Sequence, residues 1–61
     1  MNDVVEAAIS QLIRVKLWLE ELSGRLYGKG IIDEAELLLG CTIILHEAIE
    51  KLEKKDETVR P

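Results

Sequence analysis

The sequence predicts an all-α fold: an antiparallel two-helix hairpin that associates into a four-helix bundle, as a homodimer, or into a larger helical oligomer. Three observations support this prediction. Apolar residues recur every three or four positions along two long segments. A Gly-Lys-Gly turn at 28–30 separates these segments. The uncharged run 37–45 is apolar on every side of a helix, so one antiparallel partner helix cannot cover it.

Length and composition also favour association. The chain has 61 residues and a single Cys, so no internal disulfide can form, and no metal-ligand framework is visible. Even a compact domain of this length buries only about 60% of its unfolded surface, and a hairpin is less compact. Oligomerisation is the remaining way for such a short chain to gain stability.

Charge and the start of the chain bear on partners and compartment. The net charge is -4, with acidic residues spread along the sequence, which argues against broad electrostatic binding to nucleic acid or to an anionic membrane. The opening Met1-Asn2-Asp3 lacks the basic region of a secretory signal. No uncharged run approaches the ~20 residues of a membrane span. Because a lone thiol fits a reducing compartment, we expect a cytoplasmic protein without a membrane partner.

The first helix is expected over residues 3–27. Its seam alternates spacings of three and four and consists of Val5, Ala8, Leu12, Val15, Leu19, Leu22 and Leu26. Ile9, Ile13 and Leu17 follow a second stripe, and Trp18 lies between the two stripes. A helix with one partner does not need a second stripe, so we expect this one to contact another chain.

The turn is expected at 28–32, with Gly28 as the left-handed residue that ends the first helix. The second helix is expected over 33–55, and Asp33 with Glu36 is predicted to form a variant of the capping box at its start. Its seam is predicted to consist of Leu38, Cys41, Leu45, Ala48 (with Ile49 beside it) and Leu52. The polar tail 56–61 is expected to fray.

The oligomer interface is expected to combine the second stripe of the first helix with the apolar run of the second. Its predicted residues are Ile9, Ile13, Leu17, Trp18, Leu37, Leu38, Gly40, Cys41, Ile44 and Leu45. Gly40 and Cys41 are small enough to let another backbone approach, and we expect them to mark the crossing of two second helices about a two-fold axis.

Two residues have reactive side chains. His46 has Glu50 four positions on, but one His and one carboxylate are too few ligands for a metal site, so we favour a boundary residue bonded to Glu50 or to a partner chain. Cys41 lies in mid-helix among leucines and lacks the cationic setting of a nucleophilic thiol. We interpret it as a small buried apolar residue. The sequence therefore predicts no catalytic residue, no cofactor and no metal site.

The hairpin architecture resembles the plasmid repressor-of-primer family, whose hairpins dimerise into four-helix bundles and bind RNA through their first helices. The segment Leu45-His46-Glu47 is similar to a Leu-His-Asp segment of that family. The resemblance implies RNA binding. The candidate nucleic-acid contacts are the basic residues of the first half, Arg14, Lys16, Arg25 and Lys29. Glu20 and Glu21 interrupt any basic stripe, so this remains the alternative function.

The turn sequence Gly-Lys-Gly-Ile-Ile-Asp at 28–33 is similar to that of the small sporulation phosphatases that act on response regulators. Their signature Ser-Gln-Glu-Leu-Asp does not occur here. The nearest stretch is 42–46, which carries His46 where that family has the key Asp. We therefore do not carry the phosphatase activity over, and we assign the chain to neither family.

The leading functional prediction is a non-enzymatic interaction module, namely a small regulator, adaptor or assembly subunit. Its expected partner is a second copy of itself, with another protein as a further partner through a helical face. The alternative is a nucleic-acid-binding regulator. A third, more distant alternative is a bundle that binds a metal or a small ligand through His46 and nearby carboxylates.

Overall fold

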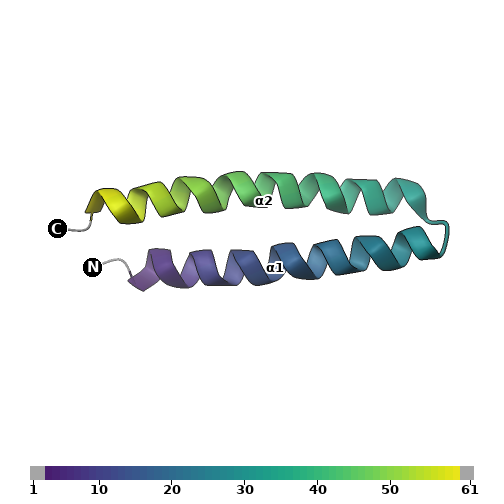
Figure 1. The fold of residues 1–61 in the computed structure, drawn as a ribbon, viewed down its shortest axis with the longest axis horizontal. Helices are drawn as coiled ribbons and strands as arrows, with labels where there is room; N and C mark the ends of the chain where they lie inside the picture. The colour runs from purple at the N-terminus through teal and green to yellow at the C-terminus, as the bar shows by residue number, and fades with distance from the viewer. Residues whose placement is uncertain (1–2, 60–61) are drawn as a thin grey trace.

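The computed structural model describes residues 3–59, with side chains described for residues 3–55. The chain forms two helices, α1 at Asp3–Gly28 and α2 at Ile32–Val59. They pack against each other as an antiparallel hairpin, and both ends of the described chain lie at the end away from the turn (Figure 1). The expected all-α hairpin is therefore confirmed, and its association into a bundle stays a prediction.

The second helix is longer than expected. α2 runs to Val59, whereas the sequence predicted an end at 55 and a frayed tail over 56–61. Residues 56–59 contain neither Gly nor Pro, and the first helix breaker after them in the sequence is Pro61. The helix therefore includes most of the expected tail, whose last two residues, 60 and 61, lie outside the described part of the chain.

The turn is a Schellman motif centred on Gly30. The Ile31 amide donates to the Leu26 carbonyl oxygen at 2.9 Å, and the Gly30 amide donates to the Tyr27 carbonyl oxygen at 3.0 Å. Gly30 has a φ of 79°, so it is the left-handed residue. The prediction that Gly28 has this role was wrong, because α1 continues through Gly28 and the motif places its positive φ two residues later.

The start of α2 also differs from the expected capping box. α2 begins at Ile32, so Asp33 lies inside the first turn instead of at the cap position. Within the described residues, neither Asp33 nor Glu36 makes a side-chain hydrogen bond. The Schellman turn brings Ile31 directly to the position before the helix, which removes the geometry that the box requires. Asp33 and Glu34 still lie where the helix dipole favours carboxylates.

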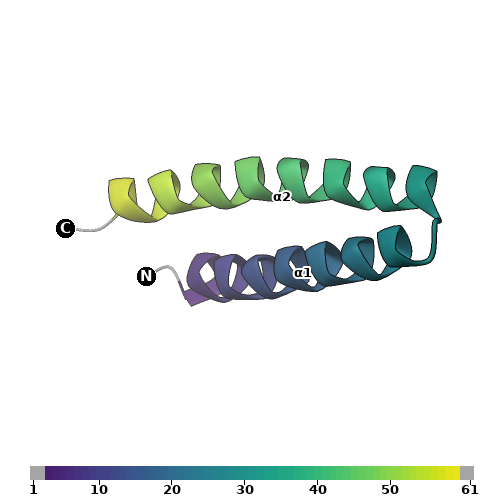
Figure 2. The same ribbon diagram turned by 45° about the vertical axis from the view of Figure 1, so that its right-hand side comes forward.

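The most buried side chains near the turn are small. Ser23 is 1% exposed and donates its hydroxyl hydrogen to the Ala35 carbonyl oxygen at 2.9 Å. Ala35 is itself fully buried. Small residues from both helices let the two backbones approach closely here, and Figure 2 shows the helices diverging from this end towards the termini. The register of the hairpin therefore places Ser23 opposite Ala35.

The contact stripe of α2 keeps Leu38, Leu45 and Leu52 as predicted, all half-buried, and shifts by one residue at the two positions between them. Thr42 and Ile49 are buried, whereas Cys41 is exposed and Ala48 is half-buried. Thr42 tolerates burial because its hydroxyl donates to the Leu39 carbonyl oxygen at 2.7 Å. The stripe through Thr42 and Ile49 has the same three-and-four spacing as the predicted one. It prevails because Ile49 removes more apolar area from water than Ala48.

The seam of α1 departs from the prediction at one position. Six of its seven predicted members are half-buried, but Val15 is exposed and Lys16 is half-buried beside it. The side chain of Lys16 covers apolar surface with its methylene stem while its ammonium group remains near water. The α1 seam is therefore also shifted around the helix near its middle.

The hairpin is long and thin. Its principal extents are 50 × 14 × 10 Å, and its radius of gyration is 14.3 Å. A compact domain of this length has a radius of gyration of about 10–11 Å. Two helices that share one seam cannot enclose a core, which is why few side chains are fully buried.

We expect Gly30→Ala to lower the free energy of unfolding by about 1–2 kcal/mol, because a residue with a Cβ pays that cost in the left-handed region. Gly24→Ala is the matched control. Gly24 is exposed in the interior of α1, and an added Cβ there meets nothing within 4 Å, so this change is expected to raise stability by up to ~1 kcal/mol. Denaturant unfolding followed by circular dichroism at one protein concentration measures both. Unchanged stability of Gly30→Ala contradicts the turn geometry.

Candidate interaction surface

Three large apolar side chains are largely exposed between the middle of the hairpin and its turn end. Leu37 is 71% exposed, Ile44 is 67% exposed and Trp18 is 60% exposed. Val15 and Cys41 are also exposed. Val15 and Trp18 are three residues apart on α1, and Leu37, Cys41 and Ile44 follow each other at spacings of four and three on α2, so each set lies on one side of its helix. We call these five residues the Trp18 face.

Two contacts between the helices show that both halves of the Trp18 face lie at the same level. Ser23 contacts Ala35, and Lys16 contacts His46. Trp18 is five residues before Ser23 and two after Lys16, which places it opposite the stretch 40–44 of α2. The aromatic side chain of α1 and the apolar run of α2 therefore meet in the middle of the hairpin.

The opposite side of the hairpin is mixed in character. The Lys16 ammonium Nζ lies 3.5 Å from His46 Nδ1, and His46 Nε2 lies 3.6 Å from Glu50 Oε1. Ile43 and Leu39 are exposed between these polar groups. Trp18 is two residues from Lys16, which is about 200° around the helix, so this side faces away from the Trp18 face. We call the five residues Lys16, Leu39, Ile43, His46 and Glu50 the His46 face.

The residues expected at the oligomer interface divide into two groups. The exposed ones are Ile13, Leu17, Trp18, Leu37, Gly40, Cys41 and Ile44. The half-buried ones, Ile9, Leu38 and Leu45, already contribute to the contact between the two helices. The sequence analysis missed Val15, Leu39 and Ile43 as exposed apolar residues. It assigned Val15 to the seam, and the other two are apparent only once the rotation of α2 is known.

Cys41 does not have the surroundings expected of it within the hairpin, and the expected crossing of two second helices at Gly40 and Cys41 stays a prediction. Cys41 was interpreted as a buried small residue, but it is exposed because the α2 seam passes through Thr42 instead. Gly40 is exposed, and a Cβ built there meets nothing within 4 Å. Neither residue therefore mediates the approach of α1 to α2.

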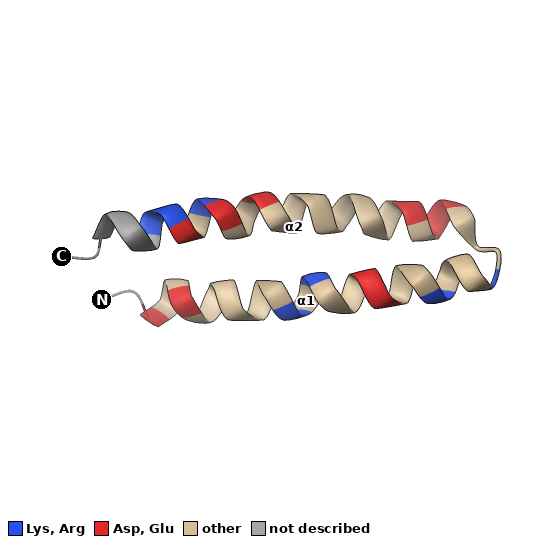
Figure 3. Cartoon of the chain, viewed as in Figure 1, with Lys and Arg blue, Asp and Glu red and all other residues tan. Residues whose placement is uncertain are grey.

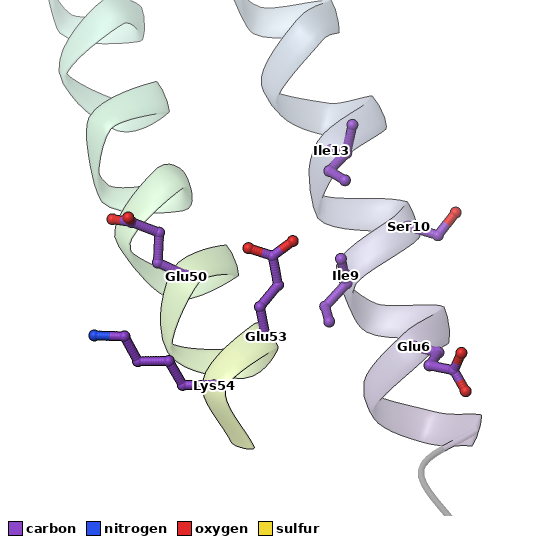
Figure 4. Close-up of a pocket in the computed structure, with 7 residues that line it drawn as sticks. All are labelled: Glu6, Ile9, Ser10, Ile13, Glu50, Glu53 and Lys54. Carbon is purple, nitrogen blue, oxygen red and sulfur yellow. The ribbon is translucent and has the colours of Figure 1, made fainter. Parts of the chain in front are cut away.

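A hollow of about 700 Å³ lies between the helices near the termini. Its lining consists of Glu6, Ile9, Ser10, Ile13, Glu50, Glu53 and Lys54. Ile9 and Glu53 point towards each other across the gap, whereas Glu6 and Ser10 point away from it (Figure 4). It opens where the helices diverge. No polar side chain that lines it is buried, so the hollow has no built binding site.

The four basic residues considered for nucleic-acid contact are not gathered on one side. Arg14 and Lys16 are two residues apart and therefore point in roughly opposite directions. Arg25 Nη2 donates to Glu21 Oε1 at 2.7 Å, and Lys29 lies in the turn. In Figure 3 a red acidic stretch interrupts the blue positions along α1. The described chain thus presents no continuous basic strip.

The described residues hold neither a cluster of metal ligands nor a membrane-spanning helix. They contain no group of three or more His, Cys, Asp or Glu side chains placed to hold a metal ion. Across the same residues, neither helix has a stretch of the length and apolarity needed to cross a bilayer. His46 lies within reach of Glu50 alone among the carboxylates described, as an exposed pair whose charge attraction requires a protonated ring.

The fold defines the chain as a two-helix antiparallel hairpin. Comparison with protein-family models, with curated proteins and with solved structures finds no match to it. Function is therefore argued from the surface alone.

Proposed function

We propose that this protein is a non-enzymatic helical interaction module that works as a homo-oligomer. The observation that carries the proposal is the amount of apolar side chain left in water. Among the described residues, Ala35 and Ile49 are the buried apolar ones. Twelve large apolar residues are exposed, including Leu37, Ile44 and Trp18. Exposed apolar surface of this extent is typical of protein contacts.

The exposed area matches what one partner contributes to a stable interface. The hairpin exposes 4807 Å². A compact monomer of 6.9 kDa exposes about 4,000 Å². The excess of about 800 Å² equals the share of one partner in a standard protein–protein interface. Association of copies would therefore restore the surface-to-volume ratio of an ordinary domain.

A regulator, adaptor or assembly subunit is the role that suits such a chain. Such a chain works through a helical surface. Once copies have associated, the side chains that the contact between them leaves uncovered are available to bind another protein. The exposed thiol of Cys41 is compatible with a reducing compartment, and we place the protein in the cytoplasm on that ground.

Sedimentation velocity across concentrations from about 1 to about 100 µM tests this function. We expect a species larger than the monomer that dissociates on dilution. Emission of Trp18, the single tryptophan, is expected to shift to longer wavelength as dilution exposes its ring. A monomer that remains fully helical over the whole range overturns the proposal.

A further inference from the structure

We infer that a second copy of this chain docks on the Trp18 face in the antiparallel sense, so that the turn of each hairpin lies at the open end of the other. This inference rests on the proposed self-association and specifies its surface and its orientation. The arrangement leaves the His46 face uncovered.

The Trp18 face is the better surface to bury because its α2 half carries no charge from Leu37 through Cys41 to Ile44. Figure 3 shows the middle of α2 free of coloured positions, and on α1 the charged residues Arg14 and Glu21 border Trp18 at spacings of four and three. The His46 face has Lys16, His46 and Glu50 among its apolar residues. Covering these groups with an apolar partner carries a desolvation cost that the Trp18 face avoids. Tryptophan is also among the residues enriched at interface centres.

The position of the Trp18 face allows full overlap of two copies. Trp18 lies near the middle of α1, and Ile44 lies near the middle of α2. A two-fold axis through this level can run along the helices or across them. An axis across the helices stacks α2 on the partner's α2 with the turns at opposite ends. An axis along the helices stacks α1 on the partner's α2 with both turns at one end.

Charges at the two ends of the Trp18 face favour the axis across the helices. Glu34 lies three residues before Leu37, at the turn end of this side of α2. Lys51 and Lys55 lie seven and eleven residues after Ile44, at the open end of the same side. None of these three side chains makes an ion pair with another described residue. The turn end of the Trp18 face thus carries an unpaired negative charge at Glu34, and the open end carries unpaired positive charges at Lys51 and Lys55.

In the antiparallel dimer these charges become complementary. With the two-fold axis at the level of Ile44, Glu34 lies ten residues before the axis. In the antiparallel dimer it therefore lies opposite the position ten residues after Ile44 in the partner, which falls between Lys51 and Lys55. The parallel dimer instead brings the lysines of both copies to one end. It also directs Glu34 to Arg25, whose guanidinium already binds Glu21 at 2.7 Å. Glu34 therefore faces lysines of the partner in the antiparallel dimer, whereas Lys51 and Lys55 of both copies gather at one end in the parallel dimer.

Two neighbouring isoleucines test the choice of face. Ile44 on the Trp18 face is 67% exposed and Ile43 on the His46 face is 63% exposed, so a glutamate at either position leaves the isolated hairpin intact. We expect Ile44→Glu to weaken dimerisation at least about a hundredfold, because it buries an unpaired charge in each copy. Ile43→Glu is expected to change the dissociation constant by less than about threefold. Equal effects of the two variants overturn the choice of face.

Amine cross-linking of the unmodified protein tests the orientation. Equal amounts of isotope-labelled and unlabelled chains are mixed, and mass spectrometry identifies cross-links between chains. Within one chain, Lys29 and Lys51 are separated by about 33 Å at 1.5 Å per helical residue, beyond a short cross-linker. We expect cross-links between Lys29 of one chain and the lysines at 51–55 of another. Cross-links between two copies of Lys29 overturn the antiparallel orientation while leaving self-association standing, whereas a monomer in sedimentation overturns the proposed function itself.

A charge exchange tests the residues that set the orientation. Glu34→Lys is expected to raise the dissociation constant of the dimer roughly threefold to tenfold, and adding Lys51→Glu with Lys55→Glu is expected to restore it. Glu36→Lys is the control, because it makes the same charge change on the His46 side of α2. It is expected to stay within about twofold of the starting protein. Rescue of Glu34→Lys by Arg25→Glu, and not by the lysine changes, overturns the antiparallel pairing.

Discussion

One constraint governs this molecule: two helices share a single line of contact, and that line cannot cover the apolar side chains that both helices carry. The seam buries Ile49, Ala35 and parts of several leucines, but it leaves Leu37, Ile44 and Trp18 largely in water. Because the hydrophobic effect scales with the area removed from water, the uncovered side chains are the largest unused source of stability in the chain. The hairpin is thin for the same reason, because two helices with one line of contact cannot enclose a core.

The turn controls which surfaces result. A Schellman motif at Gly30 ends α1 and leads directly into α2, so the register of the two helices is set within a few residues. That register places Ser23 against the Ala35 carbonyl, where small side chains let the helices meet closely. Further along, the same register places Lys16 beside His46 on one side and Trp18 near the level of Ile44 on the other. The contrast between the two faces thus begins at the turn.

The two faces differ in what they can do chemically. The Trp18 face combines large apolar side chains with an uncharged stretch of α2 from Leu37 to Ile44, which suits a tightly packed helical partner. The His46 face has contacts at 3.5 and 3.6 Å between exposed polar groups, which contribute little stability. Neither face brings together a nucleophile, a base and an orienting group among the described residues. The role that we propose for the surface is recognition, with a selectivity that depends on shape and on the charges at its ends.

The amino-acid sequence by itself determined the two helices, the position of the turn and the excess of apolar residues. Helical periodicity and helix-breaking glycines are local properties of a short stretch of sequence, so neither depends on tertiary packing. The tertiary structure decided the rest. Stripes through Cys41 and Ala48 or through Thr42 and Ile49 have the same spacing, so only packing against α1 selects the second and exposes Cys41. Likewise, both Gly28 and Gly30 can adopt a positive φ, and the length of α1 assigns it to Gly30. Both stripes share Leu38, Leu45 and Leu52, so the helix turns by only part of the ~100° step between neighbouring residues, and it is this turn, which periodicity leaves open, that puts Thr42 in the seam and Cys41 on a face.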